Sequence, residues 1–233
     1  MRHTAIRVGF VLLLTTVSFL NVRTAAAQNQ PVAAAATQDA PPVRTSLLRL
    51  DAILTGLTVD SRAVGDARDR ALRVLRALLE LSTAWPADSP APYRRNVATL
   101  ATTVEGIARD ATPSLPAALD ALADDLGAKL EHCRASGGKL GGAVHVRVRT
   151  VQTGREAPHW QVFYMPKLFE VSPGATPDVF PTLSSPTLER LVPGRYLMWA
   201  REPDSGRQGD RVVLKVGEGR AELDVELPVP SAP

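Results

Sequence analysis

The stretch GGKLGGAVHVRV, residues 137–148, separates two parts of the sequence that differ in hydrophobic period. Upstream of it, apolar residues recur every three or four positions, which is the period of one helix face. Downstream, Val144, Val146 and Val148 alternate with polar residues, as in a strand with one face in water. The glycine pairs within residues 137–142 predict the end of a helix followed by a hinge. The sequence therefore predicts an α+β protein with two domains, over residues 44–136 and 143–229.

The first domain shows leucine-rich stripes with the period of amphipathic helices. They predict four helices, over about residues 47–57, 61–83 and 92–110 and from residue 114 onward. Ser46 and Asp60 are candidate N-caps. Because the connections are short, neighbouring helices should pack antiparallel as a four-helix bundle. The acidic residues of the fourth helix are interpreted as a solvated face: Asp120, Asp124 and Asp125.

The second domain contains short runs of period two, separated by turns rich in Gly and Pro. The runs predict strands over residues 144–149, 159–165, 195–201, 211–216 and 220–227. Short strands without intervening helices are typical of an antiparallel β-sandwich. Residues 230–233 are predicted to form a tail after the last strand.

One of these strands carries a resemblance to a known family. Leu191-Val192-Pro193-Gly194-Arg195-Tyr196 resembles the Leu-x-Pro-Gly-x-Tyr strand entry of prealbumin-like sandwiches, which include carboxypeptidase-regulatory-like and immunoglobulin-like domains of bacterial envelope proteins. Residues 142–164 are similar to their first hairpin, so the resemblance covers about residues 140–229. It implies a seven-stranded, non-catalytic module for spacing, adhesion or partner contact. The transthyretin-like hydroxyisourate hydrolases end in Tyr-Arg-Gly-Ser, whereas this chain ends in Val-Pro-Ser-Ala-Pro, so that active site does not carry over.

The N-terminus has the features of a secretory signal peptide over residues 1–27. Arg2 and Arg7 lie in a charged start, the apolar run over residues 8–20 has 13 residues, and three alanines precede Gln28. A helix of this length reaches about 20 Å, short of a bilayer core of about 30 Å. The Ala- and Pro-rich leader that follows, residues 28–43, is predicted to be disordered. We therefore expect a periplasmic or extracellular protein, cleaved after Ala27 and not membrane-spanning.

Charge and cysteine content exclude several classes of partner and site. The net charge of +3 comes from the three arginines of residues 1–27, since 24 basic and 24 acidic side chains remain beyond them. A neutral mature chain lacks the basic footprint of a nucleic-acid-binding protein. The single cysteine, Cys133, excludes an internal disulfide and a cysteine-only zinc site.

Few residues form a pattern that carries chemistry. Cys133 continues the leucine stripe of the fourth helix, which favours a buried thiol over a nucleophile. Its neighbour His132 points about 100° away on a helix and cannot form a dyad with it. His145 and His159 stand apart, without the spacing of metal ligands. We therefore predict no catalytic residue, no metal site and no cofactor.

The aromatic residues of the second domain are the candidate binding residues. Tyr196 follows Pro193-Gly194 as in a tyrosine corner, so its ring should enter the core. Trp199 has the opposite parity along the strand and should be at least partly exposed. Together with Trp160 it would form an aromatic platform for a sugar ring or a partner protein.

These observations favour an exported, non-enzymatic interaction or scaffold protein that binds an envelope protein or polysaccharide through its sandwich. Two alternatives remain open. The first is a carbohydrate-binding envelope protein that uses Trp160 and Trp199, which an exposed aromatic strip would favour. The second is a hydrolase whose site forms only in the fold, which a carboxylate pair of raised pKa in a cleft would favour.

Overall fold

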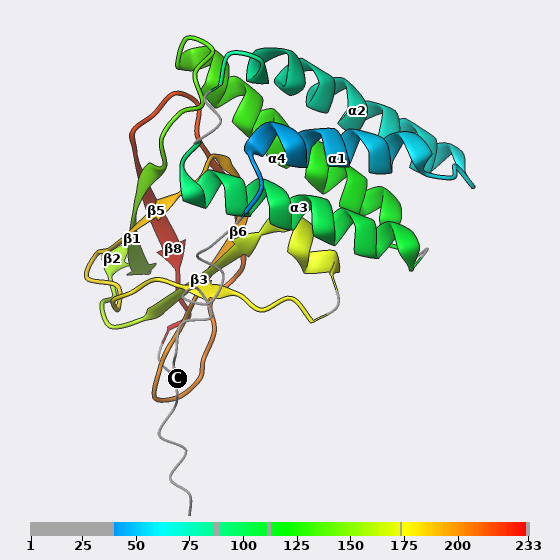
Figure 1. Ribbon diagram of the computed structural model, residues 1–233. Coiled ribbons are helices and arrows are strands. Elements are labelled where there is room, and N and C mark those ends of the chain that lie inside the picture. Colours follow the sequence, from blue (N-terminus) through cyan, green and yellow to red (C-terminus); the bar gives the residue numbers. More distant parts are fainter. Residues whose placement is uncertain (1–39, 86–88, 111–112, 173, 232–233) are drawn as a thin grey trace, which may run out of the picture. The chain divides into compact units, whose positions relative to one another are not determined.

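The computed structural model describes residues 40–85, 89–110, 113–172 and 174–231 (Figure 1). The predicted signal peptide and most of the predicted leader lie outside these residues. Within them the protein is an α+β structure with four α-helices and two four-stranded β-sheets. No helix of the described residues is long and apolar enough to cross a membrane.

The helices come first along the chain and the strands follow. The helices are α1 (Val43–Gly56), α2 (Arg62–Ser82), α3 (Ala91–Arg109) and α4 (Leu115–Ala135). The strands are β1 (Val144–Gln152), β2 (Arg155–Glu156), β3 (Gln161–Pro166), β4 (Asp178–Val179), β5 (Thr187–Leu191), β6 (Gly194–Arg201), β7 (Val212–Val216) and β8 (Glu222–Pro228), with a 3-10 turn η2 (Lys167–Val171) after β3.

Both predicted N-caps are wrong. Helix α1 begins at Val43, which places Ser46 inside its first turn, where the side chain is buried. At α2 the cap is Ser61 rather than Asp60, because the Ser61 hydroxyl accepts a hydrogen bond from the backbone N–H of Val64 at 3.3 Å. Strands β2, β4 and β5 lie outside the runs that the sequence predicts as strands.

The leucine stripes of all four helices meet in one buried cluster. Each helix contributes a fully buried leucine to it: Leu50, Leu75, Leu100 and Leu122. Burying side chains of this size contributes about 1.5–3 kcal/mol each. The stripes thus predict correctly which face of each helix leaves water.

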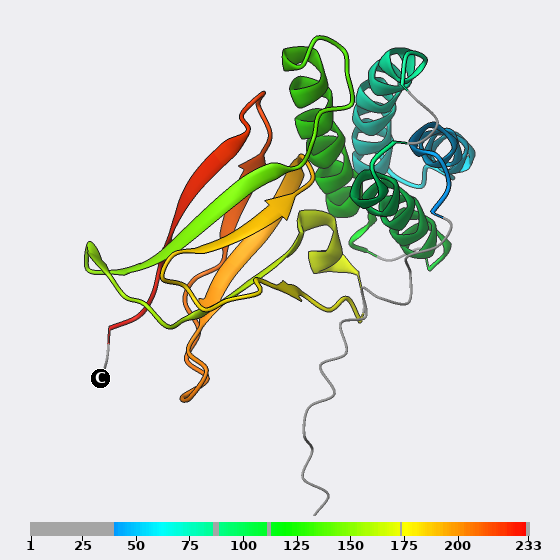
Figure 2. The ribbon, with the colours of Figure 1, turned by 60° about the vertical axis from the view of Figure 1, so that its left-hand side comes forward.

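The sheets share a second buried cluster. Sheet A contains β1, β2, β5 and β8, and sheet B has the strand order β4-β3-β6-β7. Val146 and Val148 of sheet A lie in one cluster with Val162 and Met198 of sheet B. All pairings are antiparallel except that of β8, which runs parallel to β1 (Figure 2). The prediction of an entirely antiparallel arrangement is wrong at this pair.

Tyr196 occupies the position that the sequence predicts for it. Its ring is buried in the cluster between the sheets, 6.1 Å from the ring of Tyr164. Its hydroxyl donates a hydrogen bond to the carbonyl oxygen of Val192 at 2.8 Å. The hydroxyl therefore fixes the turn before β6, as in a tyrosine corner.

A buried ion pair joins α4 to the start of β6. Lys129, which is fully buried, donates from Nζ to Asp125 Oδ2 at 2.6 Å and to the carbonyl oxygen of Pro193 at 2.7 Å. The backbone N–H of Arg195 donates to the other oxygen, Asp125 Oδ1, at 3.0 Å. The prediction that Asp125 is solvated is therefore wrong, and the reason is that the turn before β6 supplies its partners.

Gly194 lets the two parts of this contact approach one another. A Cβ at this position would lie 2.4 Å from Asp125 Oδ1 and 3.2 Å from Lys129 Nζ.

Apolar residues of the second half, Leu168 and Val192, also belong to the helical cluster. The described residues accordingly fall in a single compact unit, with helices and strands in contact. Separate stability of the two predicted domains stays a prediction.

His132 extends this contact toward the turn between β7 and β8. Its side chain is buried, and its Nδ1 accepts a hydrogen bond from the backbone N–H of Gly219 at 3.3 Å. A Cβ at Gly141 would lie 2.0 Å from its Nε2, so the chain also closes over the ring at residue 141. Burial lowers the pKa of His132, which keeps the imidazole neutral and able to accept.

We expect acid to weaken the fold through His132. The unfolded chain takes up a proton at the ordinary pKa of about 6.5, whereas the folded chain resists protonation. The stability that this imidazole contributes is therefore present above pH 6.5 and lost as pH falls through the lower pKa of the folded state. Urea unfolding across pH 7.5 to 4.5 would measure it, with His132→Gln flattening part of the pH dependence. His159→Gln, at an exposed position, is the control. An unchanged pH dependence in His132→Gln would contradict the assignment.

Candidate functional site

The two predicted binding residues lie on opposite faces of sheet B and both are buried. Trp160 belongs to the cluster between the sheets and is 6% exposed. Trp199 lies on the outer face, as its parity predicts, but only 5% of it is exposed. The prediction of an exposed Trp199 is wrong, and the structure does not bring the two indoles together.

Side chains of β3, of η2 and of two connecting segments cover Trp199. Phe163 of β3 stacks on it with ring centroids 5.8 Å apart. The Arg211 guanidinium lies over the Trp199 ring, with Cζ 4.8 Å from the ring centroid. Phe169 of η2 and Ala175 pack against the same cluster. Trp199 thus forms a small second core under these residues, and it offers no open ring face for a sugar.

A carboxylate pair with one perturbed member lies where β4 and β5 border the two sheets. Partial burial and the nearby Glu189 carboxylate raise the pKa of Asp178. Burial raises the pKa of Tyr164, and the same two carboxylates raise it further. Neither carboxylate lines the two hollows described below.

Cys133 and His145 are two other residues for which the sequence raises a chemical role. Cys133 is buried, as the leucine stripe predicts, and burial raises the pKa of its thiol. His145 lies on the outer face of sheet A. Across the residues that the structure describes, no group of three or more His, Cys, Asp and Glu side chains could hold a metal ion.

The outer face of sheet A carries exposed charged side chains from β1, β5 and β8. Val144, Val146 and Val148 of β1 point inward, so the residues between them point outward. The same alternation applies to β8 and β5. We call this surface the charged face; it consists of His145, Arg147, Arg149, Leu188, Arg190, Glu222, Asp224 and Glu226.

The parallel register of β1 and β8 places opposite charges side by side. His145 lies opposite Glu222, and Arg147 lies opposite Asp224, with 3.9 Å between Arg147 Nε and Asp224 Oδ1. Arg149 pairs with Glu226 in the same way. More than half of each of the four paired side chains is exposed. Exposed pairs contribute about 0–1 kcal/mol, so these charges add little to folding and stay accessible.

The charged face also contains a hollow and one exposed apolar side chain. A hollow of about 250 Å³ is lined by Arg147, Arg149, Glu156, Pro186, Asp224 and Val225. Leu188 of β5 lies opposite Arg147 in the register and is 49% exposed. An exposed leucine beside a hollow and ordered charges is a combination suited to protein contact.

A larger hollow, of about 690 Å³, lies at the ends of the helices. Ile53, Leu57, Val64 and Leu115 contribute its apolar lining. Its most prominent carboxylate, Glu105, already pairs with Arg49 and Arg109. Those internal pairs reduce what a ligand would gain there, so the charged face is the better candidate.

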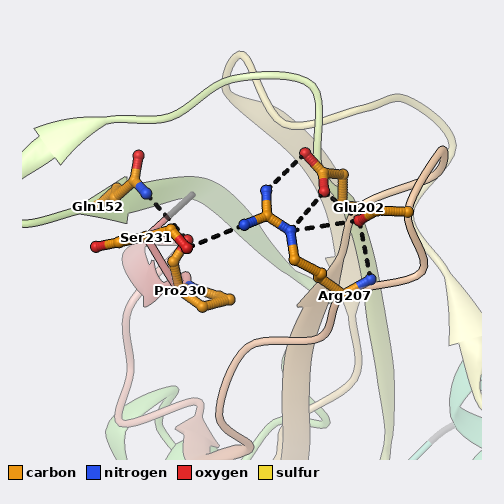
Figure 3. A network of polar contacts seen from close by, with 6 residues as sticks. Gln152, Glu202, Arg207, Pro230 and Ser231 are labelled. Carbon is orange, nitrogen blue, oxygen red and sulfur yellow. Dashed lines mark hydrogen bonds and ion pairs between the residues drawn. The ribbon is translucent and has the colours of Figure 1, made fainter. Parts of the chain in front are cut away.

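A network at the chain's C-terminal end holds β8 in place (Figure 3). Arg207 donates to both carboxylate oxygens of Glu202, at 2.8 and 3.1 Å, and to the carbonyl oxygen of Ser231 at 2.9 Å. Gln152 donates to the carbonyl oxygen of Pro230 at 3.0 Å. Hydrogen bonds from Arg207 and Ser205 lower the pKa of Glu202. The network fixes the segment after β8 to the β6–β7 connection.

Only the basic part of the charged face is predicted from the sequence. Alternation predicts that one side of residues 145–149 faces water, but it does not show which strand supplies the acidic partners of these residues. Glu222, Asp224 and Glu226 alternate with apolar residues as the basic residues of β1 do. Two alternating runs of opposite charge are the pattern that could have indicated neighbouring strands.

Comparisons with known proteins add no assignment. Neither the known protein families nor the curated proteins contain a match. Among solved structures, a crystal structure of (S)-allantoin synthase is similar over 78% of this chain and 73% of that chain, with 11% sequence identity and a TM-score of 0.29. A likeness at this level carries no argument about fold or function.

Proposed function

We propose that this chain is an exported, non-enzymatic interaction protein of the bacterial envelope, whose charged face binds a partner protein. In this proposal, residues 1–27 direct export, the four helices form an antiparallel bundle, and the two sheets form a prealbumin-like sandwich. The observation that carries it is the charged face, where β1 and β8 present opposite charges in register beside the exposed Leu188.

The energetics of the charged face support a role in recognition. Surface ion pairs such as those of Arg147 and Arg149 add little to stability. Ordered rows of charge do, however, steer a partner and fix its register, because a misplaced partner would bring like charges together. Binding to polysaccharide through Trp160 and Trp199 has less support, since both indoles are covered.

The proposal is tested by recovering partners from the native envelope. The full chain, with residues 1–27 retained for export and a tag at its C-terminus, would be crosslinked in cells and purified. The variant Arg147→Glu/Arg149→Glu and a control, Arg73→Glu, at an exposed position of α2, would be treated in the same way. We expect one partner protein to be recovered with the wild type and the control and to be lost from the double variant. Recovery of the same proteins with all three chains would refute the charged face as the binding surface.

A further inference from the structure

Strand β8 is paired along one edge only. Its neighbour in sheet A is β1, and within the described residues no other strand pairs with it. His145 N–H donates to the carbonyl oxygen of Ala221 at 2.8 Å, and Val229 N–H donates to that of Val151 at 2.9 Å. In a parallel pair, these bonds mean that every second residue of β8 directs its N–H and C=O toward β1. The residues between them direct their backbone groups away from β1: Glu222, Asp224 and Glu226.

The same three residues carry acidic, exposed side chains on the charged face. A long exposed strand edge is a hazard because it can pair with another copy of itself. Pairing β8 with the β8 of a second copy would set rows of carboxylates against each other, and like charges directly opposite are destabilising. The edge is therefore built to reject a second copy while its backbone groups remain available.

We propose that the free edge of β8, from Glu222 to Glu226, accepts an extended segment of a partner protein as an added strand, with Arg or Lys at alternate positions of that segment. The inference rests on the proposed function and names the edge and the partner's chemistry. Backbone hydrogen bonds would provide affinity, and the alternating charges would set the register.

Strand β1 shows that such a sequence fits beside β8. Its outward residues His145, Arg147 and Arg149 stand in register with the three acidic residues, and its inward residues are valines. A basic strand on the free edge would place a second row of positive charge against the same carboxylates. The acidic row would then lie between two basic rows, which is the arrangement of alternating charge that sheets favour.

The far end of β8 limits the length of the added strand. Pro228 occupies the next outward position and has no N–H to offer. A Cβ at Gly209, in the β6–β7 connection, would lie 2.5 Å from the carbonyl oxygen of Pro228, so this end of β8 is already in contact with the chain. The edge therefore accommodates a short segment, opposite residues 222–226.

A labelled peptide, acetyl-Thr-Arg-Val-Arg-Val-Arg-Thr-amide, tests the proposal by fluorescence anisotropy with the full mature chain. We expect saturable binding, and at least tenfold weaker binding of the matched peptide with Glu in place of Arg. Two further peptides carry N-methyl groups on the Arg or on the Val nitrogens. One of them should bind at least tenfold more weakly and the other little changed, because only alternate N–H groups face β8. Equal binding of both N-methylated peptides, or of the acidic peptide, would overturn the proposal.

Variants of the protein locate the site. Asp224→Asn should weaken binding about twofold to fivefold, as expected for one exposed charge pair. Asp224→Pro removes an N–H that points to the free edge, and it breaks no hydrogen bond between β8 and β1. This variant should bind the peptide at least tenfold more weakly. Glu80→Gln, at an exposed position of α2, should leave binding unchanged. Thermal melts check that each variant folds. If Asp224→Pro does not fold, the two N-methylated peptides still test whether the segment adds as a strand.

The outcomes separate this inference from the proposed function. If Arg147→Glu/Arg149→Glu loses the envelope partner while no peptide discriminates, the partner binds the charged face without adding a strand. In that case the strand-addition proposal is wrong and the proposed function stands. If peptides discriminate as expected but the double variant keeps its partner, the proposed function is wrong for that partner.

Discussion

Lys129→Met is expected to lower the free energy of unfolding by about 3–5 kcal/mol, the cost of breaking a buried ion pair by removing one member. The substitution leaves the carboxylate of Asp125 buried, with the backbone N–H of Arg195 as its remaining partner. It also removes the hydrogen bond that the carbonyl oxygen of Pro193 accepts. Urea unfolding of the mature chain, followed by circular dichroism, would measure the loss.

Two further variants make this test specific. Asp124→Asn changes a carboxylate one residue away that lies at the surface and pairs with Arg70, so it should change stability by less than about 0.5 kcal/mol. Lys129→Met/Asp125→Leu removes both charges and should recover part of the loss, because no buried charge is left without a partner. A cost below about 1 kcal/mol for Lys129→Met alone would show that water reaches the pair.

Trp199→Ala is expected to cost about 3–5 kcal/mol, the range for large buried aromatic residues. The ring is 5% exposed and stacks on Phe163, so its removal leaves a cavity under the Arg211 side chain. Tyr196→Ala should cost a similar amount, because its ring is equally buried in the other cluster. Thermal and urea unfolding of the two variants would compare them.

Two milder variants separate the contributions. Tyr196→Phe keeps the ring and loses the hydrogen bond to Val192, for a cost of about 1 kcal/mol. Arg211→Ala removes the guanidinium over Trp199 and should also cost about 1 kcal/mol or less. A near-neutral Trp199→Ala would contradict the burial of the indole under Phe163 and Arg211.

Periodicity predicts which side of each element faces a core. The leucine stripes lie in the helical cluster, and the opposite parity of Tyr196 and Trp199 is confirmed by their places in two different clusters. These features depend on local geometry alone, because a helix and a strand repeat their side-chain directions at fixed intervals. The four helices could therefore be predicted from the sequence.

Features that depend on a distant neighbour could not be predicted. Asp125 is followed by Leu126 and preceded by Asp124, so its pattern is that of a helix surface, but residues 193–195 meet it there. Parity assigns Trp199 to the outer face, yet the cover over that face comes from β3, η2 and Arg211. Strand β5 contains Glu189 and Arg190 and follows a proline, so its alternation is weak.

The pairing of β1 with β8 has a consequence for the order in which the chain can fold. A chain that leaves a ribosome or a translocation pore N-terminus first exposes residues 144–152 long before residues 222–228. Closing so long a loop costs entropy before the strand contacts form and stabilise the pair. Such pairings are therefore late events in folding. Until the last strand emerges, β1 keeps one edge open and sheet A stays incomplete. The helices, whose contacts are closer along the chain, can form during that interval, and the C-terminal strand then completes the sheet half of the fold.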